Sequence, residues 1–517
     1  MLDKHVRKRL DANFSKAYKD SMEPIDTIDN HILDFASCYR ALSARDARFD
    51  GVFFTGVKST GVYCRPVCSA KTPLAKSCTF FATAANAEQA GFRPCLRCRP
   101  ELAPYAIQQN LAYAIWQRIV AGALNEGKLD TLAQQVGLST RQLRRVLQQH
   151  FGVSPVELAQ TQRLLFAKKL LQETALPMTD IAFAAGFHSI RRFNALFVLR
   201  YGMAPTALRN SQRVNHSGLK LRLAYRPPLD WERMLHYLAP RSLGGVEWID
   251  FKHMAYVRTL RLASQDGWLR VTQDARKHQL CIELPLHCTS GLMPLLAQLR
   301  QLFDLDANPG VIEQHLHADQ LLANHLHAHP GLRVPGTLDR FELGMRTILG
   351  QQVSVAGAST LTARLIQRFG SPCSTPWPEL SHHFPLPQHI ANLSAADLAT
   401  IGVPHTRAET LRHFAQFAER GGLDFAPGAS LELVLAQLQQ VPGIGAWSAH
   451  YIALRALRFP DAFPAGDLGL QKAAAWPAPK FSEKALHARA QAWSPWRAYA
   501  AMALWQGANA PSDGSSD

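Results

Sequence analysis

The 517-residue chain lacks any run of 18 apolar residues, and its charged start, Met1 to Leu10, lacks the hydrophobic stretch of a signal peptide. These absences exclude a membrane-spanning or secreted protein and predict a cytoplasmic one. Cysteine is also scarce, with nine residues in the whole chain. Five of the nine are isolated and are interpreted as packing or surface residues, which favours a reducing compartment over a disulfide framework: Cys38, Cys78, Cys281, Cys288 and Cys373.

Acidic residues are in deficit mainly in the front half of the chain. Residues 1–216 hold 29 Lys plus Arg against 16 Asp plus Glu, a balance of +13, whereas the remainder holds 27 against 24. Concentrated positive charge suggests phosphate-bearing partners, although a solvated surface would give the same count. The length exceeds what one hydrophobic core normally spans, so several domains are expected.

Four cysteines have the spacing of ligands for one metal ion. Cys64 and Cys68 form a Cys-x3-Cys pair, and Cys95 and Cys98 form a Cys-x2-Cys pair. Two short cysteine pairs from distant turns can converge on a single tetrahedral zinc. A purely structural zinc is the simplest interpretation of this spacing, and it stays open beside a chemical one.

The residues around these cysteines resemble the amino-terminal domain of the Ada methylation-response proteins over about 70 residues, on the segments from Phe53 to Cys68 and from Gly91 to Cys98. The resemblance implies that Cys64 accepts a methyl group from a DNA methylphosphotriester while the other three cysteines mainly hold zinc. A zinc-bound thiolate is the form of cysteine that attacks carbon. Methylation would change the formal charge of the site from about −2 to about −1, so repulsion from DNA would fall. Arg65, next to the acceptor, is a candidate DNA contact.

Residues 105–212 have helical periodicity and contain two helix-turn-helix patterns, Leu129 to Leu147 and Thr179 to Asn194. Gly137 and Gly186 occupy the turns, and Ser139 is placed to cap a second helix. A single such pattern is often only a packed helical hairpin. Two such patterns in tandem, directly after an Ada-like module, predict a domain that binds DNA and reads its sequence.

The paired units, with Phe197 and the segment from Arg200 to Pro205, resemble the AraC-type DNA-binding domain. The resemblance implies an all-α double helix-turn-helix fold and RNA polymerase as a further partner. Arginine binds guanine edges or phosphates, so the sequence does not separate specific from non-specific contacts. The candidate groove residues are Thr140, Arg141, Gln142, Arg144, Arg145, His188, Ser189, Arg191, Arg192 and Asn194.

A polar stretch near residues 210–218 predicts a linker, after which a new domain begins. Alternating apolar and polar residues in 256–262, 267–271 and 279–284 predict antiparallel strands of a small α+β unit that ends near residue 305. Helical periodicity then continues almost to the end of the chain.

The second chemical signal is the segment Val441-Pro442-Gly443-Ile444-Gly445. A Pro-Gly-x-Gly hairpin between helices lets backbone N–H groups approach a phosphate. Asp467 follows Gly445 by 22 residues. Alone, the hairpin could be a helix turn and Asp467 a helix cap, but together they resemble the helix-hairpin-helix DNA glycosylases.

Residues 219–508 resemble AlkA-type 3-methyladenine DNA glycosylases, on the segments from Tyr225 to Trp231, from Arg346 to Ser354 and from Trp493 to Tyr499. The resemblance implies that Asp467 is the catalytic carboxylate and that Trp447, Tyr451 and Trp505 line the base pocket. Aromatic faces attract a cationic alkylated purine, although Trp447 and Tyr451 could instead be ordinary core residues. Gln352 departs from the pattern, because it replaces the apolar residue that wedges into the duplex.

Three further absences limit which activities and cofactors are expected of the chain. Relatives with lyase activity carry a lysine two residues after the last hairpin glycine, where this chain has Trp447, so base removal without strand cleavage is expected. No cysteine follows Cys373, which excludes the four-cysteine iron–sulfur cluster of some relatives. There is no Pro-Cys-His-Arg motif of the O6-alkylguanine methyltransferases.

The sequence thus predicts a mostly α multidomain protein that combines a small zinc-bound α/β domain, a double helix-turn-helix domain, an antiparallel α+β domain and all-α helix-hairpin-helix domains. The predicted function is excision of alkylated bases together with a methylation-activated transcription regulator, acting on double-stranded DNA as a monomer. The alternative is a glycosylase whose front half only anchors it to DNA. The expected divisions are 1–35, 36–104, 105–212, 213–218, 219–305, 306–508 and 509–517.

Overall fold

The computed structural model describes residues 34–104, 111–209, 218–262, 265–425, 429–475 and 480–507. The tail predicted for 509–517 lies outside the described residues, as do nearly all of the predicted N-terminal extension and linker. Helices predominate, and small sheets occur in both halves, so the predicted mostly α multidomain class is confirmed. Among the described residues no helix is long and apolar enough to cross a membrane.

The cysteine module, residues 34–104, is a four-stranded sheet in the order β3-β1-β2-β4 with helices on its flanks. Gly56 in β1 is required by close packing, because a Cβ there would lie 2.7 Å from the Phe81 ring. Phe53 packs edge-on against Phe80 with ring centroids 5.3 Å apart, which anchors α2 to the sheet. The elements are α2 (Phe35–Ala44), η2 (Ala47–Phe49), β1 (Phe54–Val57), β2 (Val62–Cys64), η3 (Ala75–Ser77), β3 (Cys78–Phe81), α3 (Ala84–Gln89), β4 (Arg93–Pro94) and η4 (Pro100–Leu102).

Residues 111–209 form the helix-turn-helix module, with both predicted units present. Gly137 and Gly186 adopt φ values of +69° and +80° at the two turns, where glycine is favoured. Ser139 and Ser189 cap the second helix of each unit. The long helix α7 joins the units and packs against β5, so most of its residues are buried. The helices are α4 (Leu111–Val120), α5 (Leu129–Gln135), α6 (Thr140–Phe151), α7 (Pro155–Glu173), α8 (Met178–Ala184), α9 (Ile190–Tyr201) and α10 (Pro205–Leu208).

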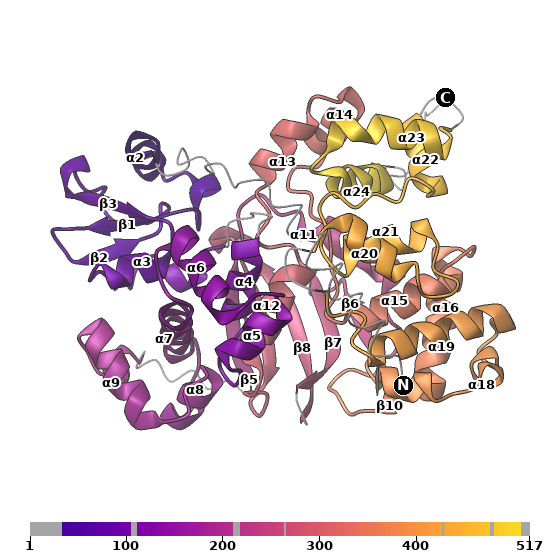
Figure 1. Ribbon diagram of the computed structural model, residues 1–517, viewed down its shortest axis with the longest axis horizontal. Coiled ribbons are helices and arrows are strands. Elements are labelled where there is room, and N and C mark those ends of the chain that lie inside the picture. The colour runs from indigo at the N-terminus through magenta and orange to yellow at the C-terminus, as the bar shows by residue number, and fades with distance from the viewer. Residues whose placement is uncertain are drawn as a thin grey trace.

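An antiparallel five-stranded sheet, in the order β5-β9-β8-β7-β6, stands between the front half and the C-terminal helices (Figure 1). The predicted strands correspond to β7, β8 and β9. β8 and β9 alternate buried and partly exposed residues, whereas β7 is buried on both faces, since Arg258 pairs with the buried Glu342 and Val257 packs with Leu380. Phe303 packs edge-on against Trp231 and Tyr256, which joins the sheet to α11. The elements are β5 (Gly218–Ala224), α11 (Trp231–Leu238), η5 (Ala239–Arg241), β6 (Glu247–Asp250), β7 (Ala255–Leu262), β8 (Gln265–Asp274), η6 (Ala275–Lys277) and β9 (Gln279–Pro285).

The remainder is helical, as predicted, except for a two-stranded ribbon of β10 (Ser371–Pro372) and β11 (His382–His383). The orange and yellow helices of Figure 1 form the wall opposite the cysteine module. The helices are α12 (Leu292–Leu302), α13 (Pro309–Leu316), α14 (Gln320–Ala328), α15 (Arg340–Leu349), α16 (Val355–Phe369), α17 (Pro387–Ala391), α18 (Ala395–Ala399), α19 (His405–Glu419), α20 (Leu431–Leu438), α21 (Ala446–Arg455), α22 (Leu468–Ala475), α23 (Glu483–Ala490), η7 (Gln491–Trp493) and α24 (Arg497–Gly507).

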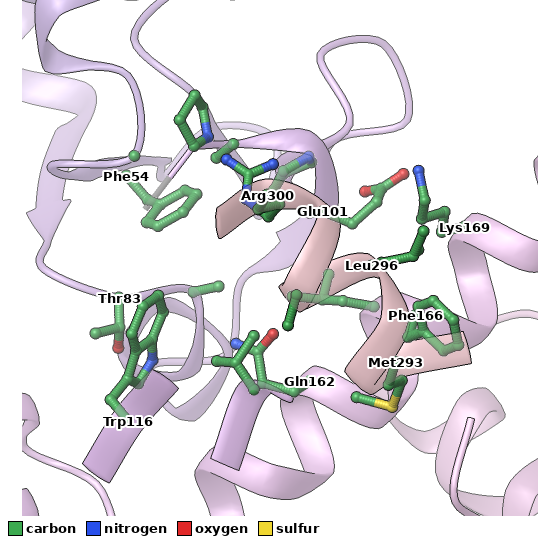
Figure 2. Close-up of a pocket in the computed structure, with 18 of the residues that line it drawn as sticks. Phe54, Thr83, Glu101, Trp116, Gln162, Phe166, Lys169, Met293, Leu296 and Arg300 are labelled. Atoms are coloured by element: carbon green, nitrogen blue, oxygen red, sulfur yellow. The ribbon is translucent and has the colours of Figure 1, made fainter. Parts of the chain in front are cut away.

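The two halves meet along a buried seam. Glu173 of α7 accepts a hydrogen bond of 3.1 Å from the Arg222 backbone N–H, and Lys169 donates to the Arg222 carbonyl. Arg118 of α4 donates to the Phe425 carbonyl at 3.0 Å. A cavity of about 100 Å³ remains in the seam between α7 and α12 (Figure 2).

Gly51 lies at the edge of this seam, where the cysteine module packs tightly against its own chain at Pro104. Its φ is +77°, and a Cβ at this position would lie 1.6 Å from the Pro104 carbonyl oxygen and 3.4 Å from Nη2 of Arg226. A side chain therefore has no room here, and the conformation itself favours glycine.

Candidate functional site

The four predicted cysteine ligands converge. Parallel pairing of β2 with β4 places Tyr63 opposite Pro94, which brings Cys64 and Cys95 to the same edge of the sheet. The sulfur atoms of Cys64, Cys68, Cys95 and Cys98 all lie within 4.8 Å of one another. A tetrahedral zinc with Zn–S bonds of about 2.3 Å needs sulfur–sulfur separations of about 3.8 Å, so the cluster fits one ion. Hydrogen bonds among the four thiols lower the pKa of Cys68 and Cys95 and raise the pKa of Cys64 and Cys98, so the four groups share their protons.

Arg65 differs from its predicted role as a DNA contact. Its side chain is buried, Nε donates to Asp50 at 2.8 Å, and Nη1 donates to the Cys98 carbonyl at 3.1 Å. Its backbone N–H points at Cys98 Sγ, 3.3 Å away. The guanidinium therefore braces the cysteine cluster from inside and is not available to a phosphate.

Tyr63, on the other side of Cys64, leads to the helix-turn-helix module. Its hydroxyl donates to Glu88 at 3.1 Å, and the other Glu88 oxygen accepts from Thr161 of α7 at 3.0 Å and lies 3.5 Å from Arg200 of α9. Burial raises the pKa of Glu88 to about 7. The strand that carries Cys64 is thus tied to the second recognition helix.

The predicted groove residues divide into two groups. Thr140 binds Asp130 and Gln142 completes the Ser139 capping box, so both serve the turn. His188 hydrogen-bonds the Asn125 carbonyl at 2.7 Å. Ser189 caps α9, whereas the remaining candidates are exposed on α6 and α9: Arg141, Arg144, Arg145, Arg191, Arg192 and Asn194.

The predicted hairpin lies between α20 and α21. Gly443 has φ +89°, and a Cβ there would lie 2.1 Å from Thr410 Oγ1, whereas a Cβ at Gly445 would meet nothing within 4 Å. Gly445 caps α21, whose first N–H groups have no side chain of the cap residue over them. A helix start of this kind offers N–H donors and a positive dipole end to a phosphate.

We expect Gly443→Ala to lower the free energy of unfolding by about 1–3 kcal/mol, because it forces an L side chain into a left-handed conformation against Thr410. The matched variant Gly445→Ala should fold normally but bind DNA more weakly, since its methyl group stands where a phosphate would approach. Thermal unfolding and DNA titration at low salt measure the two effects. Equal unfolding temperatures for the two variants would contradict this account.

Gln352 lies beside the hairpin, as its predicted wedge role requires. It is exposed on the loop between α15 and α16 with φ +57°, and Val353 next to it is 39% exposed. Gln351 donates to the Gly443 carbonyl at 2.9 Å and to Ser448 Oγ at 3.0 Å. The loop between α15 and α16 is therefore fixed to the hairpin.

Asp467 lies between the two predicted tryptophans. Its Oδ2 accepts from Trp447 Nε1 and its Oδ1 from Trp505 Nε1, both at 3.0 Å. Oδ1 also accepts from the Leu470 N–H at 2.9 Å, so the residue caps α22 as well. Two indole donors hold the carboxylate in one orientation, which adds a positioning role to the predicted aromatic lining.

The predicted base-pocket aromatics are contiguous. Trp447 and Tyr451 stack with centroids 5.4 Å apart and planes at 13°, and Tyr451 meets Trp505 at 6.0 Å. Arg455 donates to the hydroxyls of Tyr451 and of Tyr237 at 3.0 Å each. Burial alone would raise the pKa of Tyr451, but neighbouring guanidinium groups, foremost that of Arg455, lower it to about 8.

Sequence reasoning missed Tyr237, Arg241 and Arg455. Arg241 stacks over the Tyr237 ring at 4.0 Å and lies, with Tyr237, in a cleft of about 380 Å³ beside Gln506. Arg455 could have been found, because it follows Tyr451 by one helical turn and shares its helix face. Nothing in the sequence indicated that α11 returns to this site.

Two features indicate a DNA repair protein with one site in each half. The front half joins a four-cysteine cluster to paired helix-turn-helix units, and the back half places a hairpin beside a carboxylate held by two indole N–H groups. Family models match in the same order: the metal binding domain of Ada at 37–101, a helix-turn-helix domain at 132–211, the AlkA N-terminal domain at 220–339, and the HhH-GPD superfamily of base excision DNA repair proteins at 345–498. The AlkA N-terminal model extends past residue 305, where the strand pattern ends.

The chain is 39% identical, over 91% of its own length and 96% of the relative's, to the "Probable bifunctional transcriptional activator/DNA repair enzyme AlkA" of Mycobacterium tuberculosis. It is 37% identical to DNA-3-methyladenine glycosylase 2 of Escherichia coli, over 55% of this chain and 95% of the relative. The 3-methyladenine DNA-glycosylase structure from Archaeoglobus fulgidus shares the fold, with a TM-score of 0.50 and 19% identity, over 57% of this chain and 99% of that one. The chain belongs to the family of bifunctional transcriptional activator/DNA repair enzymes of the AlkA type.

Proposed function

We propose that this chain hydrolyses the N-glycosidic bond of alkylated purines such as 3-methyladenine in DNA, with Asp467 as the catalytic carboxylate. The observation that carries the proposal is the pair of indole N–H groups that hold Asp467 beside the stacked Trp447 and Tyr451 rings. The flipped base would lie against these aromatic faces. The hairpin, through Gly443 and Gly445, would hold the backbone, and Gln352 would fill the gap in the duplex.

The reaction requires little of the protein beyond the correct placement of the alkylated base and of the Asp467 carboxylate. The C1′–N bond breaks with its electron pair going to the cationic base, which leaves neutral, and a water oxygen bonds to C1′ while its proton passes to Asp467 or solvent. The carboxylate stabilises the positive charge that develops on the sugar. Because Trp447 occupies the position of the lyase lysine, the reaction would stop at an abasic site.

We propose a second activity at Cys64, whose sulfur would take the methyl group from a DNA methylphosphotriester. A sulfur–carbon bond forms, a carbon–oxygen bond breaks, and an ordinary phosphodiester leaves. Cys64, Cys68, Cys95 and Cys98 would hold the zinc, which when bound keeps the sulfurs deprotonated. The loss of one negative charge would then strengthen promoter binding by the exposed arginines of α6 and α9.

The remaining parts of the proposal concern the setting. We place the chain in a reducing, cytoplasmic compartment, where the thiols of the cysteine cluster would stay available to a metal. The chain would act as a monomer and would recruit RNA polymerase once it is methylated. It would use no iron–sulfur cluster. Its domains would be divided at about residues 35, 104, 212, 218, 305 and 508. The seam between the halves also favours a second candidate, in which the front half only anchors the glycosylase to DNA.

One experiment tests these proposals together. The full chain is incubated with methylated DNA, the bases set free are identified by chromatography, and the protein is analysed by mass spectrometry. We expect 3-methyladenine in the supernatant and a methyl group on the peptide that contains Cys64. Base release without protein methylation would leave only the anchoring candidate.

A further inference from the structure

The cysteine cluster is connected to the seam by buried polar groups. Cys98 Sγ accepts the Arg65 backbone N–H at 3.3 Å, and the Arg65 side chain is held by both Asp50 carboxylate oxygens. Arg65 is 9% exposed and Asp50 4% exposed. In such surroundings a charged pair is stable only in good geometry, so the position of Asp50 depends on that of the cluster.

Arg226 carries the connection across the seam. Its Nε and Nη2 donate to the Asp50 carbonyl at 3.0 and 2.6 Å, and its Nη1 donates to the Asp306 carbonyl. The side chain is 2% exposed. A guanidinium this deeply buried needs all its acceptors, and those at Asp50 belong to the front half of the chain.

From Arg226 the connection continues into the back half. The Arg226 carbonyl accepts from Arg333 Nη2 at 2.6 Å, and Arg333 is 3% exposed. The residues directly after Arg333 supply acceptors to another buried guanidinium. The Pro335 carbonyl accepts from Arg455 Nε, and the Gly336 carbonyl from Arg455 Nη2 at 3.2 Å.

Arg455 completes the connection at the excision site. Its Nη1 donates to the hydroxyls of both Tyr237 and Tyr451 at 3.0 Å. Tyr451 in turn stacks on Trp447, the indole that binds Asp467. A path from the cluster sulfur to the aromatic pocket thus runs through hydrogen bonds to main-chain carbonyls and the Asp50 carboxylate, and along the backbone between residues 333 and 336. Four buried arginines stand along it: Arg65, Arg226, Arg333 and Arg455.

We propose that the metal centre regulates base excision through this path, which rests on the proposed function of both sites. The element with two states is the docking of the halves: when the cluster holds its metal, Asp50 is fixed and Arg226, Arg333 and Arg455 hold the pocket in its working geometry. When the metal is lost, Asp50 shifts, Arg226 loses its acceptors and the pocket loosens. The cavity between α7 and α12 gives the seam room to shift without overpacking (Figure 2).

The test compares the full-length protein, the variant Arg226→Met and the matched control Arg276→Met, an exposed arginine of the same half. Each is assayed with and without a zinc chelator for 3-methyladenine release, with kcat and KM separated, and for hydrogen exchange of the backbone N–H groups in 225–226 and in 331–336, where Pro335 has none. We expect chelation to lower kcat/KM by about 2- to 30-fold and to speed exchange in both segments of the unsubstituted chain and of the control. In Arg226→Met both changes should already be present, and chelation should add little.

If chelation lowered kcat/KM by the same factor in Arg226→Met as in the unsubstituted chain, the two losses would multiply. That result would overturn the proposal, because two effects that multiply are independent and do not share a path. Unchanged exchange on chelation of the unsubstituted chain would overturn it as well, even if Arg226→Met failed to fold. Failure of the proposed function would give a different result from failure of the proposed regulation. In that case no base would be released under any condition, while hydrogen exchange would still report whether loss of the metal reaches the two segments.

Discussion

Asp467→Asn is expected to lower the rate of 3-methyladenine release from methylated DNA by about 10²- to 10³-fold, the range found when one preorganised electrostatic group is removed from an active site. An amide cannot stabilise the developing sugar cation. Its Nδ2 donor would also oppose one of the two indole N–H groups that now bind the carboxylate. Single-turnover base release on a defined duplex measures the effect.

The affinity of Asp467→Asn for DNA should stay within about twofold of that of the unsubstituted chain, since a neutral amide in place of a carboxylate removes no favourable phosphate contact. Glu483→Gln is the matched control, because this exposed carboxylate lies 3.4 Å from a Cβ built on Gly466, the residue that precedes Asp467. Base release at the normal rate by Asp467→Asn, or an equal loss in Glu483→Gln, would remove Asp467 from its proposed role.

Cys64→Ala is expected to lose all methyl uptake from phosphotriesters and, with it, damage-dependent promoter activation. Alanine carries no nucleophile, and the resemblance gives the other three cysteines the role of holding the metal. Radiolabelled methyl transfer and a promoter reporter in alkylated cells measure the two losses. Excision should continue, because Cys64 is not part of the aromatic pocket, and it should slow only to the extent that the variant loses its zinc, since the metal centre is proposed to regulate the pocket.

Cys78→Ala is the matched control in the same small sheet, where its buried thiol lies outside the cluster. It should take up a methyl group at the normal rate. Zinc content per chain separates loss of the nucleophile from loss of the metal. Promoter activation that persists in Cys64→Ala would leave the cysteine module as a passive anchor.

Most of the site could be predicted from the sequence because its signals are local. The two cysteine pairs need only short turns to converge, and Gly137, Gly186 and Gly443 stand where the backbone has positive φ. Hairpin and carboxylate were recognisable from their spacing. Strand alternation identified β8 and β9, since one face of each packs on the core, and it identified β7 as well, although both faces of β7 are buried.

Side-chain direction could not be predicted in the same way. Arg65 follows the acceptor cysteine and looks like a phosphate contact, yet its guanidinium turns inward to a carboxylate 15 residues earlier. The Trp505 indole reaches an Asp467 oxygen 38 residues away. Tyr237 meets Arg455 across 218 residues. Such pairs depend on how whole domains dock, and no local pattern encodes that.

Gly51 gives the fused architecture a simple vulnerability. Two enzymes joined only by a tether would tolerate change at their touching surfaces, since each could drift away from the other. Here a single added methyl group would collide with the Pro104 carbonyl and press toward Arg226. The Pro104 carbonyl belongs to the same cysteine module as Gly51, so the collision would first displace the backbone on either side of it. The Asp50 and Pro104 carbonyls both accept from Arg226 Nη2, and their displacement would disturb a contact that joins the two halves.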